Sequence, residues 1–425
     1  MSCSSFQFNH AAALMQAIMT FEGPADAVTS RYFREHPNLG AHDRAFVAET
    51  VFAVLRHSRL LEHVAGDRVP RHLVAAYLLK LRGLNRRELA PCLREGEMEW
   101  AARVKAASLA DEPLAVQAEL PDWVVERLRH WPDDEVLAFG RAMQTAAPLD
   151  LRVNTVRATR ADVLAALEKE GIAASPTPYS PVGVRLADKR ALARHPLFLE
   201  GHIEVQDEGS QLLAFLLAPK RHDRVVDFCA GAGGKTLALG ALMHSQGHLY
   251  AFDVSEKRLS RFRPRLKRSG LSNVSAALIS HENDARIKRL AGKIDRVLVD
   301  APCSGLGTLR RNPDLKWRQS PHTLAELTAR QAAILAAAAR LLKPGGRLVY
   351  ATCSILPEEN DAQVDAFLAA HPEFVRRDAA EIFARARIPL DTGPYCRLGP
   401  HRHGTDGFFA AVLERTAGAP GDAPP

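Results

Sequence analysis

Two cysteines in this sequence follow strand-like apolar runs. Cys303 comes after the run in "IDRVLVDAPCSG", and Cys353 comes after the run in "GRLVYATCSI". A single cysteine at a strand end is usually a small core residue. Two of them in the same setting, one directly after Asp300-Ala-Pro, favour chemistry instead. Cysteine is a strong nucleophile even when only a few per cent of it is ionised, so the pair indicates covalent catalysis.

A glycine-rich loop supplies a second chemical feature. The stretch "VVDFCAGAGGKTLALG" is typical of a strand, a tight loop and a helix, whose first N–H groups are free to bind a ligand. A phosphate-binding P-loop requires glycine at position 229, which is Cys229 here, so that motif is excluded. Gly231, Gly233 and Gly234 match a dinucleotide motif in part. An S-adenosylmethionine site, in which such a loop packs against the amino-acid end of the cofactor, is equally compatible.

Two acidic residues could complete a nucleoside site. Asp253 ends the run "LYAFDVS", roughly twenty residues beyond the glycines, where a carboxylate can accept hydrogen bonds from ribose hydroxyls. This feature serves NAD and S-adenosylmethionine equally. Asp284, in "SHENDARIKRL", is a candidate for contacting adenine. Each of the two acids has an ordinary alternative role as a helix N-cap.

The elements that position these residues follow from the pattern between Ser210 and the C-terminus. Short apolar runs alternate with helical stretches, which predicts a parallel, doubly wound α/β sheet. The carboxyl ends of such strands border the ligand crevice, so the glycine loop and both cysteines are expected at one edge of the sheet. The predicted strands are "DRVVDFCA", "GHLYAFDV", "NVSAALIS", "IDRVLVDAP", "GGRLVYATC" and "DGFFAAVLE".

The preceding sequence predicts two further domains. Residues 1–145 carry apolar residues at three- and four-residue spacing, which indicates a helical bundle with a basic outer face. Residues 146–209 combine strand-like runs with one amphipathic helix capped by a threonine, and so predict a small α+β module. The α/β domain is then expected over 210–415, and the tail 416–425 is expected to be disordered.

Composition narrows the class of protein. The chain has 425 residues, a formal net charge of +7 and 6 cysteines. The charge favours a polyanionic partner. No Cys-x-x-Cys pair is present, and the cluster His401-Arg402-His403 lacks an acid or cysteine at metal spacing, so no metal site is expected. Neither a secretory signal nor an apolar run long enough to span a membrane is recognisable, and a cytoplasmic monomer is expected.

At the level of motifs, the chain resembles the Nop/Sun family of RNA (cytosine-5) methyltransferases. The similarity rests on "DFCAGAGGKT", "LVDAPCSGLGTLRRNPDLKW", "VYATCSILPEEND" and "DGFFAAVL", with "LDLRVNT" and "IEVQDEGSQL" upstream. The helical N-terminus is similar to the NusB-like RNA-binding domain of the bacterial 16S ribosomal RNA member. One departure is Gly231-Ala232, where many relatives carry Ala-Pro. The turn glycines are kept, so the departure leaves cofactor binding intact and bears on subfamily and substrate.

The resemblance implies a Rossmann-like class I methyltransferase that uses S-adenosyl-L-methionine to methylate cytosine C5 in RNA, with 16S ribosomal RNA as the favoured substrate. By resemblance Cys353 is the nucleophile that adds to C6, and Cys303 helps to remove the C5 proton or to release the product. Asp300 is placed to hydrogen-bond the N3/N4 edge of the base, which requires a proton on its carboxyl if it is to donate to N3. Lys235 is expected to orient substrate or neutralise charge. The expected cofactor-binding residues are Cys229, Ala230, Gly231, Gly233, Gly234, Lys235, Asp253, Arg258, Asp284 and Asp300.

Because a stacked base hides C5 and C6, the target cytosine must be flipped out or come from a loop. Phosphate contacts are expected from Arg310, Arg311 and Lys316, which follow Cys303 closely. The basic stretch "SEKRLSRFRPRLKRSG" is a second candidate, with a solvated helix face as its alternative.

Three other functions remain open on the sequence. Transfer RNA could be the substrate. An NAD-linked oxidoreductase would explain the glycine loop and Asp253 but would leave both cysteines without a role. A non-catalytic RNA-binding assembly factor would not need Asp300, Cys303 and Cys353, which are all intact.

Overall fold

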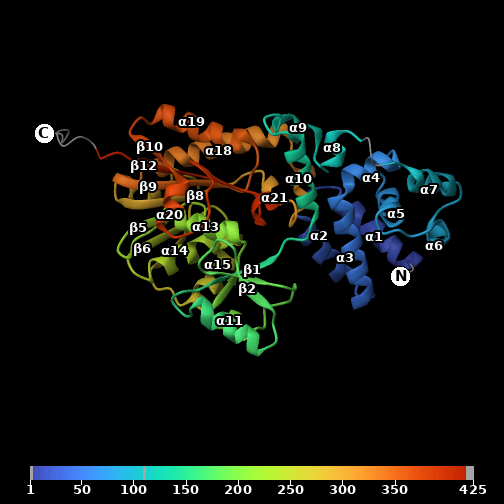
Figure 1. Ribbon diagram of the computed structural model, residues 1–425, viewed down its shortest axis with the longest axis horizontal. Coiled ribbons are helices and arrows are strands. Elements are labelled where there is room, and N and C mark those ends of the chain that lie inside the picture. The colour runs from blue at the N-terminus through green and yellow to red at the C-terminus, as the bar shows by residue number, and fades with distance from the viewer. Residues whose placement is uncertain (1–2, 109–111, 418–425) are drawn as a thin grey trace. The chain divides into compact units, whose positions relative to one another are not determined.

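The computed structural model describes residues 3–108 and 112–417. Contacts divide the chain into two compact units (Figure 1). The first unit combines Met1–Ala146 with Thr308–Pro321, and the second combines Ala147–Gly307 with His322–Pro425. The segment 308–321 thus groups with the helical unit, although its sequence lies within the expected 210–415 domain. Most of the expected disordered tail, from residue 418 onward, lies outside the described residues.

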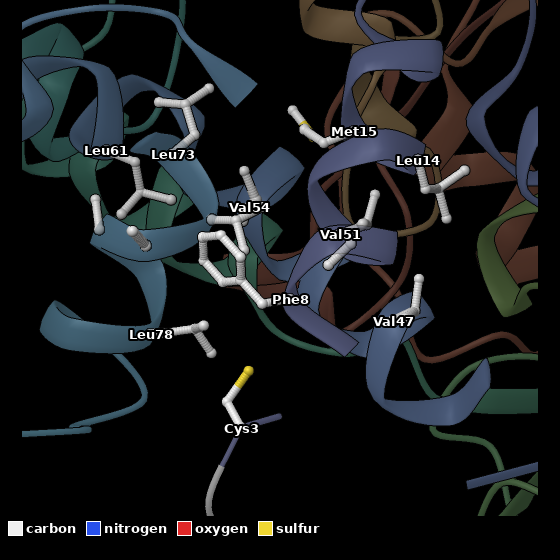
Figure 2. Packing of buried hydrophobic residues seen from close by; sticks show 14 of the residues in the cluster. Cys3, Phe8, Leu14, Met15, Val47, Val51, Val54, Leu61, Leu73 and Leu78 are labelled. Carbon is white, nitrogen blue, oxygen red and sulfur yellow. The ribbon is translucent and has the colours of Figure 1, made fainter. Parts of the chain in front are cut away.

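The first unit is helical, as the spacing of its apolar residues predicts. Its core gathers one face of each main helix, and Figure 2 shows Phe8 packed among Val51, Val54, Leu61 and Leu73. The helix that follows Gly40 ends at Arg56, and a second helix begins at Ser58, directly after His57. The helices are α1 Ser5–Ile18, α2 Ala25–Glu35, α3 Ala41–Arg56, α4 Ser58–Ala65, α5 Pro70–Lys80, α6 Arg86–Leu89, the 3-10 turn η1 Ala90–Cys92, α7 Glu97–Ala106, α8 Leu114–Gln117, α9 Asp122–Arg127, α10 Asp133–Gln144 and α17 Leu315–Arg318.

A small four-stranded sheet begins the second unit. Its strands are antiparallel in the order β2-β3-β1-β4. The expected helix is α11 (Arg160–Lys169), and Thr159 is its N-cap, as predicted. Because this sheet belongs to the second compact unit, its status as a separate domain stays a prediction. Its other elements are β1 Leu149–Val153, β2 Ala174–Pro176, β3 Gly183–Leu186, α12 Pro196–Leu199 and β4 Ile203–Val205.

The large sheet of the second unit is Rossmann-like. Its order is β10-β12-β9-β8-β5-β6-β7, with β11 pairing on β12. The five strands from β9 to β7 in this order are parallel, and β12 is antiparallel to β9. All six predicted strands are present, as β5 Arg224–Asp227, β6 His248–Asp253, β7 Val274–Leu278, β8 Ile294–Asp300, β9 Leu342–Thr352 and β12 Phe408–Arg415; β10 Phe374–Arg377 and β11 Cys396–Leu398 are additional.

Helices cover both faces of this sheet, and the alternation of side chains along each strand explains why. Val226 and Val297 pack with α18 and α19 on one face, whereas Val225 and Leu298 pack with α13 and α20 on the other. Figure 1 shows these two helical layers above and below the strands. The elements are α13 Glu208–Leu217, α14 Gly234–Leu242, α15 Glu256–Ser269, α16 Ala285–Lys288, η2 Leu306–Thr308, α18 Pro321–Ala339, η3 Pro357–Glu359, α19 Asp361–Ala370, α20 Ala379–Arg385 and α21 Pro400–His403.

The chain order creates a switch point in the sheet. From β5 the chain proceeds to β6 on one side, and later crosses to β8 on the other side of β5. Ligand sites of open α/β sheets lie outside the carboxyl ends of the strands at such a point. The predicted site residues follow β5, β6, β8 and β9, so the topology brings them to this edge.

Candidate active site

The glycine loop connects β5 to α14 through a sharp left-handed turn. Gly233 caps α14 with φ +82°, and a Cβ at this position would lie 1.9 Å from the ring of Phe262. Gly231 also has positive φ, but a Cβ there would meet nothing within 4 Å. Gly233 is therefore required for packing of the loop against α15, whereas Gly231 leaves open space beside the backbone. Burial raises the pKa of the Cys229 thiol at the start of the loop, which keeps it neutral.

Asp253 ties the end of β6 to this loop. Its carboxylate accepts hydrogen bonds from the backbone N–H of Gly231 at 2.8 Å and of Ser255 at 2.7 Å. The alternative role of Asp253 as a helix N-cap is wrong, because Ser255 caps α15 and accepts from the N–H of Arg258. Arg258 itself is well exposed and its guanidinium lies 3.9 Å from Asp253.

Asp284 has the alternative role expected for it, that of a helix N-cap. It is the N-cap of α16 and accepts from the N–H of Arg286 at 2.9 Å, and its second oxygen accepts from Ser280. These hydrogen bonds lower the pKa of the Asp284 carboxyl. Contact with adenine stays a prediction.

Lys235 and Asp300 form an ion pair at the switch point. The Lys235 ammonium, on the first turn of α14, donates to Asp300 Oδ2 at 2.7 Å, where β8 ends. Burial opposes the charge on Lys235, but the carboxylate of Asp300 outweighs this effect and raises the pKa of the lysine. Lys235 therefore stays a cation with N–H donors at the strand edge. Of the other predicted loop residues, Ala230 is buried and Gly234 is the first residue of α14.

The sequence pattern does not single out Asp227, which the structure places beneath this pair. Asp227 ends β5 and is 1% exposed; one oxygen accepts from the Thr236 hydroxyl at 2.6 Å, and Oδ1 has no hydrogen-bond partner. Burial, reinforced by the charge of Asp300, raises the pKa of Asp227 to about 7. The sequence does contain a signal for Asp227, because this acid is the last residue of the strand that precedes the glycine loop.

The two cysteines meet although they belong to different loops. Their Sγ atoms are 3.4 Å apart, and the N–H of Cys353 donates to Cys303 Sγ at 3.3 Å. The hydrogen bond to Cys353, together with burial, raises the pKa of Cys303 well above its usual value. Either sulfur can donate its hydrogen to the other across this contact.

The residues predicted to contact RNA phosphates do not all lie at the surface. Arg311 is exposed, but Arg310 is 4% exposed and Lys316 is 3% exposed. The Lys316 ammonium donates to the carbonyl oxygens of Arg56 and Glu119 and lies 3.7 Å from the Glu119 carboxylate. The Lys316 charge is thus satisfied inside the helical unit, and Arg310 is buried. Contact of these two residues with RNA phosphates stays a prediction.

The second basic candidate, α15, is also partly internal. Arg265 and Arg268 bind the buried Glu204, and Arg265 donates to the carbonyl of Ala232 in the glycine loop at 2.7 Å. Arg261 and Lys267 are exposed. The helix therefore supports the glycine loop with one face and presents cations with another.

The residues at this edge fit a nucleoside cofactor with an amino-acid end. Asp253 supplies carboxylate oxygens for ribose hydroxyls, the open side of Gly231 allows close approach, and the unpaired Oδ1 of Asp227 can accept a hydrogen bond. Within residues 3–108 and 112–417, no three His, Cys, Asp or Glu side chains gather as metal ligands. None of the helices in the same ranges is long and apolar enough to cross a membrane.

Comparison with known proteins connects this geometry to a family. The family profile described as 16S rRNA methyltransferase RsmB/F matches residues 214–414, and the RsmF/B-like ferredoxin-like domain matches residues 120–193. A probable ribosomal RNA small subunit methyltransferase B from Synechocystis is 32% identical over 92% of this chain and 95% of its own length. Ribosomal RNA small subunit methyltransferase B from Klebsiella pneumoniae is 37% identical over 81% of this chain and 78% of its own length.

Solved structures agree with the sequence relatives. The crystal structure of the protein PH0851 is 27% identical, covers 98% of this chain and all of its own, and has a TM-score of 0.78. A methyltransferase homologue from Pyrococcus horikoshii is 29% identical over 71% of this chain and 97% of its own, with a TM-score of 0.61. The predicted methyl donor, S-adenosyl-L-methionine, is confirmed as that of this group of enzymes. The identity and coverage of the relatives show that this chain belongs to the RsmB/F family of 16S rRNA methyltransferases.

Proposed function

We propose that this enzyme methylates C5 of a cytosine in small-subunit ribosomal RNA through a covalent bond between Cys353 and C6. The observation that carries this proposal is the sulfur pair: Cys303 and Cys353 lie 3.4 Å apart at the edge where the cofactor residues gather. Cytosine C5 is a poor nucleophile, and addition of a thiolate to C6 makes it enamine-like. Neither sulfur would be needed for methylation of an exocyclic nitrogen or a ribose oxygen.

In this proposal the two cysteines have separate roles. Cys353 attacks C6, and Cys303, whose pKa is raised by its bond to Cys353 and by burial, is a thiol that assists release. When bound, S-adenosyl-L-methionine supplies an electrophilic methyl group to C5. Solvent water then takes the C5 proton, the electrons of the C5–H bond re-form the C5–C6 double bond, and the bonding electrons of the S–C6 bond return to Cys353. The S–H of Cys303 stabilises the departing thiolate, which assists release.

In this proposal Lys235 and Asp300 form hydrogen bonds with the N3/N4 edge of the base. An added thiolate pushes negative charge toward N3, and the Lys235 ammonium has donors for it. Asp300 already accepts from Lys235 and can accept from the N4 amino group with its other oxygen. This arrangement revises the expectation that Asp300 itself must carry a proton, because the donor for N3 is supplied by its partner.

For the helical unit, we propose an RNA-binding role of the NusB-like kind. Support comes from its all-helical fold and from exposed cations such as Arg31 and Arg34 on α2. A flipped or looped cytosine is reachable only if the surrounding RNA is held by its phosphates. In this proposal the helical unit supplies that hold and the second unit supplies the chemistry.

The proposal is tested by offering the purified enzyme unmethylated 16S rRNA transcript and, separately, unmodified transfer RNA, with S-adenosylmethionine. Digestion to nucleosides and mass spectrometry should find 5-methylcytidine from the 16S transcript. Methylation of transfer RNA alone would overturn the proposal that ribosomal RNA is the substrate. A methylated nucleoside other than 5-methylcytidine would overturn the reaction, and no methylation of either RNA would favour the non-catalytic assembly factor.

A further inference from the structure

A buried carboxylate lies between the two cysteine loops. Glu359, the last residue of η3, is 0% exposed. Its Oε1 accepts from the N–H of Ser304 at 2.8 Å and from the side-chain amide of Gln331 at 2.9 Å. Its Oε2 accepts from the hydroxyls of Ser304 and Ser354. Both oxygens are acceptors in all four bonds, as suits an ionised carboxylate.

The partners of Glu359 are the immediate neighbours of the two cysteines. Ser304 follows Cys303 and Ser354 follows Cys353, and the two hydroxyls also lie 3.1 Å from each other. Gln331, on α18, donates a second bond to the carbonyl of Pro302, which precedes Cys303. One side chain therefore bridges the loops after β8 and β9 at the positions that fix both sulfurs.

The segment that carries Glu359 is itself firmly held. Tyr350, which is fully buried on β9, donates its hydroxyl to the carbonyl of Glu359 at 2.7 Å. The next residue, Asn360, accepts from the Thr352 hydroxyl at 2.6 Å and donates to the carbonyl of Ser354. A buried carboxylate has a high desolvation cost, which is acceptable here because every bond is charge-assisted.

We propose that Glu359 is a positioning residue that locks the Cys303 loop to the Cys353 loop and, by its charge, sets how readily Cys303 reacts. The inference rests on the proposed function, in which Cys353 attacks and Cys303 assists release. It adds a residue that touches neither substrate nor cofactor but controls both sulfurs. Without it, adduct formation and product release should become uncoupled.

The electrostatics of Cys303 agree with this role. Its pKa is raised first by the hydrogen bond to Cys353 and by burial, and then by the negative charges of Cys353 and Glu359. Removal of the Glu359 charge should therefore make the Cys303 thiol easier to ionise.

Glu359→Gln tests the charge of Glu359 with the smallest change in shape. The amide oxygen can still accept from Ser304 N–H and Gln331, and the two serine hydroxyls can rotate to accept from the new amide, so the shape is kept while the charge is lost. The matched control is Asp361→Asn, two residues later. Asp361 is partly exposed and pairs with Arg397, so the same change of charge occurs in the same segment without touching either serine.

The first measurement needs no RNA. The full-length variants are treated with limiting iodoacetamide between pH 6 and 10, and the initial rate at each cysteine is read by peptide mass spectrometry. At pH 8, Cys303 of Glu359→Gln should react at least about threefold faster than in the parent protein, because only the thiolate reacts. Asp361→Asn should match the parent. A Cys303 profile that Glu359→Gln leaves unchanged would overturn the inference, whatever the enzyme's substrate.

The second measurement follows one turnover with 16S transcript, scoring methyl transfer and the denaturant-resistant protein–RNA complex separately. Glu359→Gln should transfer the methyl group but retain several-fold more complex than the parent or Asp361→Asn. Equal retention of the protein–RNA complex by Glu359→Gln and by the parent would overturn the proposal that Glu359 couples adduct formation to release. If the parent forms no 5-methylcytidine, the proposed function fails while the alkylation result still decides the role of Glu359. Ser354→Ala, which removes one donor, should shift both readouts the same way and serves if Glu359→Gln does not fold.

Discussion

At the scale of single residues, the site depends on buried groups whose charge is set by their neighbours. The charge of Lys235 is favoured by Asp300, whose oxygen lies 2.7 Å from the ammonium, and the pKa of Cys303 is raised by its hydrogen bond to Cys353 and by burial. Asp227 is the exception, because one of its oxygens has no partner. A buried carboxyl without full hydrogen bonding favours its neutral form.

This feature of Asp227 gives a prediction for stability against pH. Its pKa rises from 3.8 in the unfolded chain to about 7 in the fold, mainly through burial. At this carboxyl the native state therefore binds more protons than the unfolded state within that window, so the stability that Asp227 contributes falls as pH rises from about 4 to 7 and then levels off. Each pKa unit is worth about 1.4 kcal/mol.

Asp227→Asn should remove that part of the pH dependence. Thermal unfolding of the variant and of the parent, measured without cofactor at half-unit steps from pH 4.5 to 8, should show a flatter decline in Tm for the variant. Parallel Tm curves for the two proteins would mean that Asp227 is ionised throughout and that its environment is wrongly described.

At the scale of elements, close approach of loops brings the cysteines together. Gly307 accepts a bond from the N–H of Gly407 at 2.7 Å and donates its own N–H to the carbonyl of Cys353 at 2.8 Å. A Cβ on Gly307 would lie 2.3 Å from the Gly407 oxygen and 2.8 Å from the Cys353 oxygen. The loop after β8 thus reaches the end of β9 only because a glycine stands there.

Gly307→Ala should therefore separate the loops. The overlap is with backbone atoms, so a shift of the chain is required, at a cost of about 1–3 kcal/mol in the free energy of unfolding. Methyl transfer should fall more steeply than stability, because the sulfur separation changes. Gly23→Ala, where a Cβ meets nothing within 4 Å, is the control for denaturant unfolding and activity. Full activity of Gly307→Ala would show that the loop spacing is not required.

The elements also show what the sequence could and could not predict. The six predicted strands were recoverable because apolar runs bounded by turn residues are a local signal, and Thr159 was recoverable as a cap for the same reason. The burial of Lys316 was not predictable, because "LRRNPDLKW" is typical of a polar loop and the partner of Lys316, Glu119, is distant in sequence. Glu359 lies in "LPEEND", which reads as an exposed turn, and only the folded loops reveal its four donors.

At the scale of the whole molecule, the net charge of +7 does not by itself identify the surface that binds RNA. Part of the basic sequence is used internally: Lys316 serves the helical unit, and Arg265 and Arg268 bind Glu204. Burial lowers the pKa of Lys316, and Glu119 only partly offsets that effect. The exposed cations, not the full count, determine the salt dependence of RNA affinity.

A pair of variants separates these two uses of charge. Lys316→Met should cost about 3 kcal/mol of stability, because the buried Glu119 loses its cation, and should leave the slope of log affinity against log salt unchanged. Arg311→Ala should leave the Tm nearly unchanged and reduce that slope by roughly 0.7–0.9 if Arg311 contacts a phosphate. Calorimetry and filter binding at several salt concentrations measure both. A reduced slope for Lys316→Met would show that Lys316 does contact RNA.

The roles of the two sulfurs are distinguished by incubating Cys303→Ala and Cys353→Ala with 16S transcript and S-adenosylmethionine and running each on a denaturing gel. Cys303→Ala should trap a protein–RNA complex that survives denaturant, because Cys353 still adds to C6 and release is impaired. Cys353→Ala should form no complex and transfer no methyl group. A complex formed by Cys353→Ala, and not by Cys303→Ala, would contradict the account and exchange the two roles.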